Sequence, residues 1–518
     1  MTSRSMRVCL ISREYPPETG WGGIATFTRH LAQGLKEIGH DVVVVSLSKD
    51  VDKTIDDDGV TIHRVSLGWI ERDYSSMNSC IPYSHYVMSA SISMWRKFLE
   101  LHSEKPFDVV DTPELLAEGF FPALTRVCPL VIRLYTPHSK FIKEGLHNVT
   151  PSFDHEFIAA MERIAMTSAD VLTSPSLDLR DYVADDLQID AEQIRIVRNP
   201  IDPDQFSPEG EQILPPTEKT RILFVGRLEE RKGIQYLIDA VPMVTAKHKN
   251  VEFVIIGDDT KNAKGQKSEL DKLKNTIERD GTGKYFEFIN RVPLDSLPSY
   301  YRSADISVVP SVYDNSPYTC LEAMSCGRPV IGTAGGGTKE YLSHNESGFI
   351  VEPKDPKAIA DAINTLIEDP ALRKQMAERA RARTLKYFQR QEIARQTAEL
   401  YELAEERWAA SQKAIVYKKA PDVIMNDALY MMKTFDALVF DTLYRFSYRF
   451  RLKHWLNLLK KRPGLFTAKI ALKCANVMTR LTGSRIGRLN DFQSWLAAEI
   501  GRKSIDQSLT KLDQSPTL

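Results

Sequence analysis

Two acidic residues, Asp314 and Glu322, lie eight positions apart in the stretch YDNSPYTCLEAMSCGRPVI. The residues that follow Asp314 fit neither a helix nor a strand, and a helical pattern begins shortly before Glu322. Because the apolar run ISVVP precedes the pair, the two acids flank the bend that leads from a buried strand into a helix. Carboxylates at such a corner can accept hydrogen bonds from sugar hydroxyls, Glu322 from a ribose diol and Asp314 from a second sugar.

Phosphate groups would fit between these two carboxylates. Amide groups at the start of a helix attract anions, and here they would come from Tyr318, Thr319 and Cys320. A second corner, FVGRLEERKGI, carries Arg227 and Lys232. Arginine offers a planar fork and lysine a mobile point charge, which together suit a diphosphate, although basic residues on a loop are often only solvated. The pattern therefore predicts a ligand with hydroxyls at both ends and a diphosphate in its middle, which describes a nucleotide sugar.

A third corner, PPETGWGGI, is rich in glycine. Gly20, Gly22 and Gly23 remove side chains where the backbone must approach something closely, just ahead of a helix N-terminus. A tight turn that needs only glycine geometry explains the same residues equally well. The spacing is not GxGxxG, so a dinucleotide site is not indicated. The run DDDG at 56–59 contains DxD, but it lies between two expected strands and is interpreted as a solvated turn, not as a metal site.

These corners belong to two successive runs of alternating strands and helices. The first run begins with RVCLIS, and the second restarts with RILFVG after the polar, Pro-bearing stretch SPEGEQILPPTEKT. We therefore predict an α/β protein with two doubly wound, Rossmann-like domains facing a cleft, where ligands bind beyond the carboxyl ends of the strands. The expected boundaries are 1–206, 207–387, a helix at 388–410 that crosses back to the first domain, and an extension at 411–518.

The extension differs in composition from the rest of the chain. Residues 442–490 hold twelve Lys or Arg and no acidic residue, and apolar residues recur at three- and four-residue spacing from 429 to 450. We expect a basic, amphipathic, helical segment. It could lie on an anionic membrane surface, or it could pack on the rest of the chain or on a second subunit; a membrane surface and self-association are favoured about equally. Binding of nucleic acid is not expected, because no recognition motif accompanies the charge.

The bulk composition excludes several classes of protein. The 518 residues include 68 basic and 69 acidic side chains, so no net charge points to nucleic acid. The six cysteines are scattered without CxxC pairs, which fits a reducing cytoplasm. No stretch approaches the ~20 apolar residues that a spanning helix needs. We expect a cytoplasmic protein, at most peripheral on the inner face of a membrane.

Five ordered motifs between about residues 6 and 405 resemble the family 4 glycosyltransferases, which are retaining enzymes of the GT-B fold. The motifs are YPPETGWGGIATFTRHLAQGLKEIGHDVVVVS, VRNPIDPDQFSP, ILFVGRLEERKGIQYLIDAV, RSADISVVPSVYDNSPYTCLEAMSCGRPVIGT and SGFIVEPKDPKAIADAI. The resemblance implies that the first domain takes a hydroxyl acceptor (a sugar, a lipid-linked sugar or a small molecule) and the second a nucleotide-sugar donor. It implies no bound metal and no further cofactor.

The resemblance also assigns roles to residues. Arg227 and Lys232 would hold the donor diphosphate, Glu322 the ribose and Asp314 the donor sugar. The remaining assignments place the phosphates or the acceptor against Gly22 and Gly23, and the base against the backbone near Arg291. In the family's same-face mechanism, the leaving phosphate helps to deprotonate the acceptor.

Two positions depart from the family's pattern. The first acid of the pair is usually glutamate, and Asp314 is one methylene shorter. Many relatives carry histidine where Tyr135 stands, and others where His138 stands, so His138 is the candidate for the group near the anomeric carbon. A phosphorylase or an epimerase would show signatures that are absent here. A non-catalytic relative that serves as a binding or scaffold module remains the alternative.

Overall fold

The computed structural model describes residues 4–20, 22–67, 81–144, 149, 151–260 and 268–412, with single positions at 456, 460, 470 and 471. The chain forms two compact units, Met1–Met431 and Met432–Leu518, and every element named below belongs to the first. The predicted basic extension at 411–518 lies almost wholly outside the described residues. In the part of the chain that is described, no helix is long and apolar enough to cross a bilayer.

The first half of this unit is built on an eight-stranded sheet in the order β3-β4-β2-β1-β5-β6-β7-β8. All neighbouring strands run parallel except β3, which pairs antiparallel with β4. Parallel strands buried on both faces read as continuous apolar runs, and Val42 to Val45 in β2 are all buried. The strands are β1 (Arg7–Ile11), β2 (Asp41–Leu47), β3 (Lys53–Asp57), β4 (Val60–Val65), β5 (Val109–Pro113), β6 (Leu130–Arg133), β7 (Val171–Ser174) and β8 (Ile194–Ile196).

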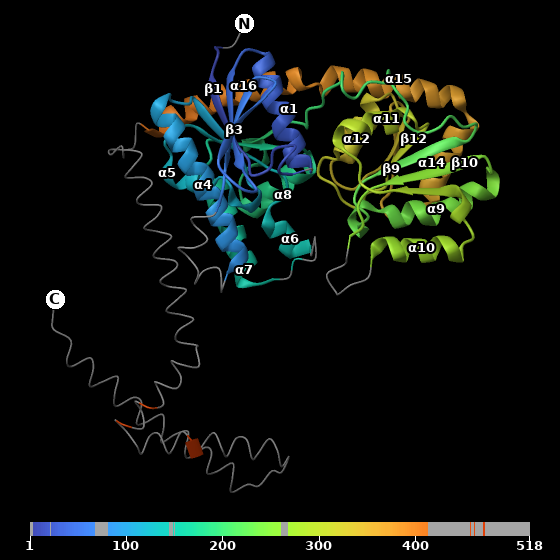
Figure 1. The fold of residues 1–518 in the computed structure, drawn as a ribbon, viewed down its shortest axis with the longest axis horizontal. Coiled ribbons are helices and arrows are strands. Elements are labelled where there is room, and N and C mark those ends of the chain that lie inside the picture. The colour runs from blue at the N-terminus through green and yellow to red at the C-terminus, as the bar shows by residue number, and fades with distance from the viewer. Residues whose placement is uncertain are drawn as a thin grey trace, which may run out of the picture. The chain divides into compact units, whose positions relative to one another are not determined.

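Helices connect these strands and lie over the sheet (Figure 1). The first follows the glycine corner directly, with Gly22 as its N-cap, and the chain leaves it at Gly39, which takes a φ of 99°. A left-handed φ at a helix end favours glycine, which explains why the helical pattern stops there. The helices of this half are α1 (Gly23–Glu37), α4 (Pro82–Glu104), α5 (Phe120–Thr125), α6 (His138–Glu144), α7 (Phe153–Ser168) and α8 (Leu177–Leu187), with short 3₁₀ turns at Leu115–Ala117 and Ala191–Gln193.

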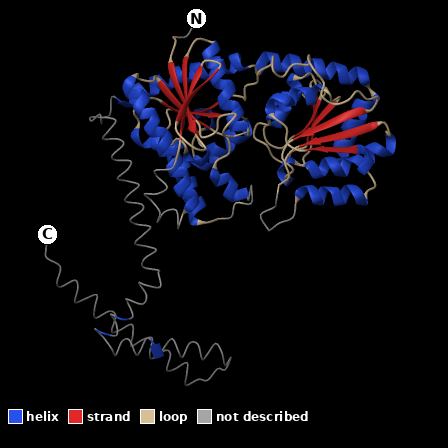
Figure 2. Ribbon diagram, viewed as in Figure 1, coloured by secondary structure: helices blue, strands red, loops and turns tan. Residues whose placement is uncertain are grey.

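The second half contains a six-stranded, fully parallel sheet in the order β11-β10-β9-β12-β13-β14. Alternate residues of its central strand enter different cores: Ile222 and Phe224 pack with one set of helices, and Leu223 packs with the other. The sheet therefore lies between two helical layers (Figure 2). The strands are β9 (Thr220–Val225), β10 (Val251–Ile256), β11 (Phe286–Ile289), β12 (Ile306–Val309), β13 (Val330–Thr333) and β14 (Gly348–Val351). The helices are α9 (Ile234–Lys247), α10 (Glu269–Arg279), α11 (Leu297–Arg302), α12 (Tyr318–Ser325), α13 (Thr338–Tyr341), α14 (Pro356–Glu368) and α15 (Pro370–Tyr387), with 3₁₀ turns at Glu230–Lys232, Gly283–Tyr285 and Leu294–Ser296.

The last described helix, α16 (Arg390–Gln412), returns to the first half. Its residues Ala394, Ala398 and Tyr401 belong to the core that surrounds β1 and β2. The Tyr401 hydroxyl donates a hydrogen bond of 2.7 Å to Asp111 in the middle of β5. This helix therefore packs on the first half, and it overlaps the segment 388–410 for which the sequence predicts such a crossing. The two doubly wound α/β halves predicted from the alternating pattern are confirmed.

Candidate active site

A cavity of about 610 Å³ lies between the two halves, at the carboxyl ends of their strands. Open α/β sheets bind ligands at this edge, and the volume suits a drug-sized or nucleotide-sized molecule. We call it the cleft cavity. The corners singled out from the sequence meet in its wall, which includes Gly20, Gly22, Gly23, Arg227, Lys232, Arg291, Asp314, Tyr318, Thr319 and Glu322.

Lys232 lies at the end of the 3₁₀ turn Glu230–Lys232, and its Nζ is 2.5 Å from Oδ2 of Asp314. Gly233 allows this approach, because it takes a φ of 71° and an added Cβ would lie 1.9 Å from the Pro310 carbonyl. A side chain there would push the turn away from the end of β12. The glycine in the motif ERKGI thus brings the cation of one corner to the carboxylate of the next.

Burial and the opposite charge of the partner shift the pKa of each residue of this pair in opposite directions. Burial lowers the pKa of Lys232, and the nearby Asp314 only partly offsets this effect. Burial would raise the pKa of Asp314, but Lys232 and Arg231 outweigh it and hold the pKa below the usual value. Asp314 is therefore charged at neutral pH, and its charge favours the protonated form of Lys232.

Arg227 follows β9 and is more accessible than Lys232. Its side chain is about half exposed, and its Nη2 lies 3.2 Å from Oε1 of Glu229. Arg231 shares the same Glu229 carboxylate at 2.8 Å, and its own Nη1 lies 3.7 Å from Asp314. Three cations therefore gather on one side of the cleft cavity. Arg231 was not among the site residues predicted from the sequence, although its position next to Lys232 could have indicated it.

Glu322 lies in the second turn of α12 and is only 4% exposed. It accepts a hydrogen bond of 2.7 Å from the Tyr301 hydroxyl. Burial raises the pKa of Glu322 to about 7. One carboxylate oxygen is thus held by Tyr301 while the residue lines the cleft cavity.

The start of α12 also lines the cleft cavity, but not with every residue that was predicted. Tyr318 and Thr319 are part of its wall. Cys320 is not, because its side chain is fully buried in the core and its amide donates to the Pro317 carbonyl. Of the three residues predicted at this helix end, Tyr318 and Thr319 line the cleft cavity and Cys320 does not.

The glycine corner has features of both alternatives that the sequence left open, a tight turn and a backbone that a ligand could approach closely. Gly20 serves turn geometry, since its φ is 72° and an added Cβ would lie 2.5 Å from the Glu14 Cβ. Gly22 and Gly23 line the cleft cavity, and Gly23 packs against the Tyr318 ring. Arg291 also lines it, with its Nη1 3.4 Å from Asp258 Oδ2.

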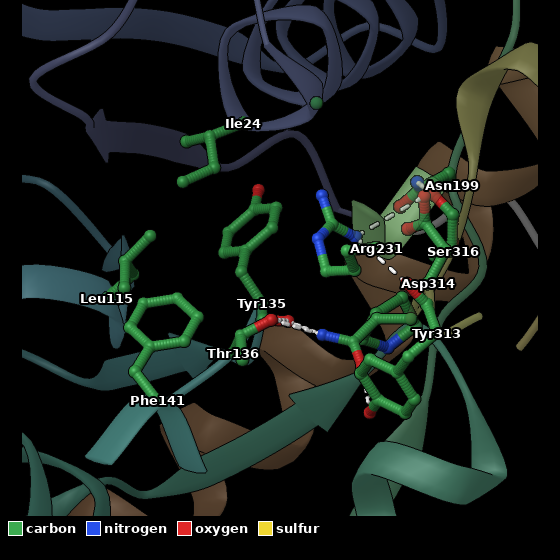
Figure 3. A pocket seen from close by; sticks show the side chains of 13 residues that line it. Ile24, Leu115, Tyr135, Thr136, Phe141, Asn199, Arg231, Tyr313, Asp314 and Ser316 are labelled. Atoms are coloured by element: carbon green, nitrogen blue, oxygen red, sulfur yellow. Dashed lines mark hydrogen bonds and ion pairs between the residues drawn. The ribbon is translucent and has the colours of Figure 1, made fainter. Parts of the chain in front are cut away.

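A second, smaller cavity of about 220 Å³ adjoins the cleft cavity and shares Gly23, Arg231, Asp314 and Ser316 with it. We call it the side cavity. Figure 3 shows mainly apolar and aromatic side chains on one side of it, and polar and charged side chains, including Asn199, Arg231 and Asp314, on the other. The first half contributes mainly apolar and aromatic side chains, namely Ile24, Leu115, Tyr135 and Phe141.

His138 lines neither cavity. Its ring is buried, with Nε2 2.8 Å from Nδ1 of His155, and its amide donates to Glu162. Burial, reinforced by His155, lowers the pKa of His138 to about 4. The backbone direction at the start of α6 turns this ring toward α7, whereas Tyr135 three residues earlier faces the side cavity. The structure thus gives His138 a packing environment instead of a place beside a substrate.

Asp58 and Gly59 of the DDDG run form the turn between β3 and β4, and Asp56 and Asp57 are the last residues of β3. Its Asp57 accepts hydrogen bonds from Arg29 at 2.9 Å and from the Tyr15 hydroxyl at 2.7 Å. Within the described ranges, no group of three or more His, Cys, Asp or Glu residues is arranged to hold a metal ion.

Two family models match adjacent parts of the chain. The model for Glycosyltransferase Family 4 matches residues 21–205, and the model for Glycosyl transferases group 1 matches residues 207–383. Together they cover well over half of the chain. The chain belongs to the family 4 glycosyltransferases.

Individual relatives agree with this assignment. The glycosyltransferase is 28% identical to an uncharacterized glycosyltransferase of Methanocaldococcus jannaschii, over 77% of this chain and 99% of the relative. Its fold is similar to sucrose-phosphate synthase of Thermosynechococcus elongatus, with a TM-score of 0.64, 22% identity and coverage of 78% and 100%. It is also similar to HepE of Anabaena, solved with UDP-glucose, with a TM-score of 0.57, 17% identity and coverage of 77% and 99%. The GT-B fold expected for this glycosyltransferase is confirmed.

Proposed function

We propose that the protein is a retaining, metal-independent hexosyltransferase that moves a sugar from a nucleotide-diphosphate sugar to a hydroxyl acceptor. One observation carries the proposal: a single cavity collects Arg227, Lys232, Asp314 and Glu322 from different corners of one sheet. The two cations suit the diphosphate, and the two carboxylates suit hydroxyls on either side of it. Synthesis of polysaccharides, glycolipids or other glycoconjugates would use such a reaction.

The chemical step is proposed to depend on electrostatic stabilisation. The transition state for glycosyl transfer resembles an oxocarbenium ion, while negative charge grows on the departing nucleotide. Arg227, Lys232 and the amides at the start of α12 would stabilise that charge. The leaving phosphate would accept the proton of the acceptor hydroxyl on the same face, which retains the anomeric configuration.

Lys232 must change partner when a diphosphate enters. In this structure its ammonium group pairs with Asp314. A diphosphate would compete for this cation and release Asp314 toward the donor sugar. Arg231, which lies 3.7 Å from Asp314, would keep that carboxylate charged during the exchange.

Binding of nucleoside diphosphates gives the first test. We expect UDP, GDP, ADP or TDP at 100-fold its dissociation constant to stabilise the protein by about 2.7 kcal/mol, which is visible as a rise in Tm. UDP is the first choice, because the similar HepE of Anabaena was solved with UDP. Arg227→Ala should lose most of the shift, since its half-exposed side chain supports ligand more than fold.

The alternative function is a GT-B relative that binds or scaffolds without catalysis. No rise in Tm with any of the four nucleotides would favour it over our proposal. A rise in Tm that persists in Arg227→Ala would show that the nucleotide binds but that residues other than Arg227 hold its diphosphate.

The basic segment after residue 410 requires a separate experiment, since its sequence allows a membrane surface or self-association. Each basic residue near an anionic surface contributes about 1 kcal/mol, so the full chain should float with phosphatidylserine vesicles. A chain truncated after residue 410 should remain in the soluble fraction. Equal flotation of both chains would exclude the membrane role, and sedimentation of the full chain would then test self-association.

A further inference from the structure

Next to Asp314, a side chain of the second half reaches across to the first half. The Asn315 Nδ2 donates hydrogen bonds to the Tyr135 carbonyl and to the Thr136 hydroxyl. Asn315 is 8% exposed, so these bonds are shielded from water. They join the loop that carries Asp314 to the aromatic wall of the side cavity.

The same place holds two further contacts between the halves. The Lys140 ammonium group lies between two rings, 4.1 Å from the Tyr182 centroid and 4.6 Å from the Tyr313 centroid. Tyr182 belongs to the first half and Tyr313 to the second. The Tyr313 hydroxyl also lies 3.0 Å from the Asp178 carboxylate in α8. Cation–ring contacts and shielded hydrogen bonds both favour the arrangement in which the halves are together.

The receiving loop in the first half is itself held from behind. Glu114, which is fully buried, accepts the Tyr135 amide at 2.7 and 2.8 Å through its two carboxylate oxygens. The Tyr135 carbonyl on the other side of this residue is the acceptor for Asn315. The loop at Tyr135 is therefore held on both sides. Its position fixes that of Asn315, and with it that of the neighbouring Asp314.

An amide side chain suits position 315, whereas a carboxylate would not. Both of its acceptors, a carbonyl and a hydroxyl, can be served by the two hydrogens of one amide. Its Oδ1 contacts the Tyr313 hydroxyl. An aspartate of the same shape could not donate to the Tyr135 carbonyl, and its charge would repel that oxygen.

We propose that Asn315 is a positioning residue for sugar transfer. By tying its loop to Tyr135 and Thr136, it sets the separation between Asp314 and the acceptor side of the cleft and keeps water out of the side cavity. This inference rests on the proposed function, in which Asp314 meets the donor sugar. Asn315 itself joins the loop that carries Asp314 to the aromatic wall of the side cavity, and it takes no part in the chemical step.

Hydrogen exchange tests the bridge without any ligand. In Asn315→Asp and Asn315→Ala, amides in residues 135–144 should exchange about tenfold faster, because a shielded hydrogen bond between the halves is lost. Asn250→Ala is the matched control: its Nδ2 also donates to a backbone carbonyl, that of Glu218 at 2.9 Å, far from the cleft. Unchanged exchange of residues 135–144 in both Asn315 variants would overturn the bridge.

Kinetics test the positioning role with the nucleotide sugar whose nucleotide gives the Tm shift. We expect Asn315→Ala to lower kcat for transfer about tenfold with little change in donor KM, because the lost bonds join the two halves and are not part of the proposed nucleotide site. The fraction of donor hydrolysed by water should rise. A fall in donor affinity with an unchanged ratio of hydrolysis to transfer would contradict the proposal. If no nucleotide sugar reacts, the proposed function fails, while the exchange experiment still decides on the bridge.

Discussion

Lys232→Ala is expected to lower the rate of sugar transfer by about a hundredfold to a thousandfold, the usual cost of removing one preorganised donor to a developing charge. The Lys232 ammonium group lies in the wall of the cleft cavity, 2.5 Å from Asp314. On our proposal the donor diphosphate takes Lys232 from Asp314 on binding, so the cation is already in place when charge grows on the leaving group. Single-turnover rates with saturating donor measure this effect directly.

A loss of activity could also arise from destabilisation, because the variant leaves the Asp314 carboxylate buried without its nearest cation. The double variant Lys232→Ala/Asp314→Asn separates the two causes. It should recover much of the lost Tm and none of the lost rate. Lys357→Ala is the control for removal of a paired lysine, since Lys357 and its partner Asp361, 2.5 Å away, are both exposed on the surface. Full activity in Lys232→Ala would remove this residue from the mechanism.

The fold was predictable because each buried parallel strand is an apolar run that ends in a polar or glycine-rich corner. RVCLIS and RILFVG begin the two halves, and both appear as central strands, β1 and β9. The site was largely predictable for the same reason, since corners at the carboxyl ends of parallel strands must meet. Gly233 and Gly20 show that the corners also depend on glycine conformation, which a sequence pattern records directly.

Side-chain direction was harder to predict than position. Tyr135 lies in a loop and His138 begins α6 three residues later, yet of the two only Tyr135 lines the side cavity. Cys320 follows two residues that line the cleft cavity, but helix geometry turns its side chain into the core. The Asn315 bridge depends on how the two halves meet, and no local pattern in either half contains that information.

Glu322→Gln is expected to stabilise the protein at alkaline pH while weakening nucleotide binding. Burial raises the pKa of Glu322 from 4.5 to about 7, so the folded protein binds this proton more tightly than the unfolded chain does. The resulting stability is fully present below about pH 4.5 and is lost as the pH rises through about 7. Glutamine carries no charge to bury and can still accept the hydrogen bond from Tyr301. At pH 8 we therefore expect the variant to be more stable by on the order of 3 kcal/mol.

The same carboxylate should bind nucleotide best when it is charged. A hydrogen bond from a ribose hydroxyl to a charged acceptor is worth roughly 1.5–3 kcal/mol, so Glu322→Gln should weaken nucleoside diphosphate binding by about tenfold or more at pH 8. In the wild type, affinity should fall as the pH is lowered from 8 to 6, whereas the affinity of the variant should change much less.

Unfolding in urea and nucleotide titrations between pH 5 and pH 8.5 measure both effects on the same samples. Glu287→Gln, which removes an exposed carboxylate from the same half, controls for the change in net charge. If the stabilities of the wild type and Glu322→Gln follow parallel curves over this pH range, Glu322 does not carry the raised pKa. If the curves diverge as expected but nucleotide affinity is unchanged, Glu322 is a buried structural acid and the ribose is bound elsewhere. The stability that the wild type gives up above pH 7 is, on our proposal, the cost of keeping a charged hydrogen-bond acceptor at the base of the nucleotide site.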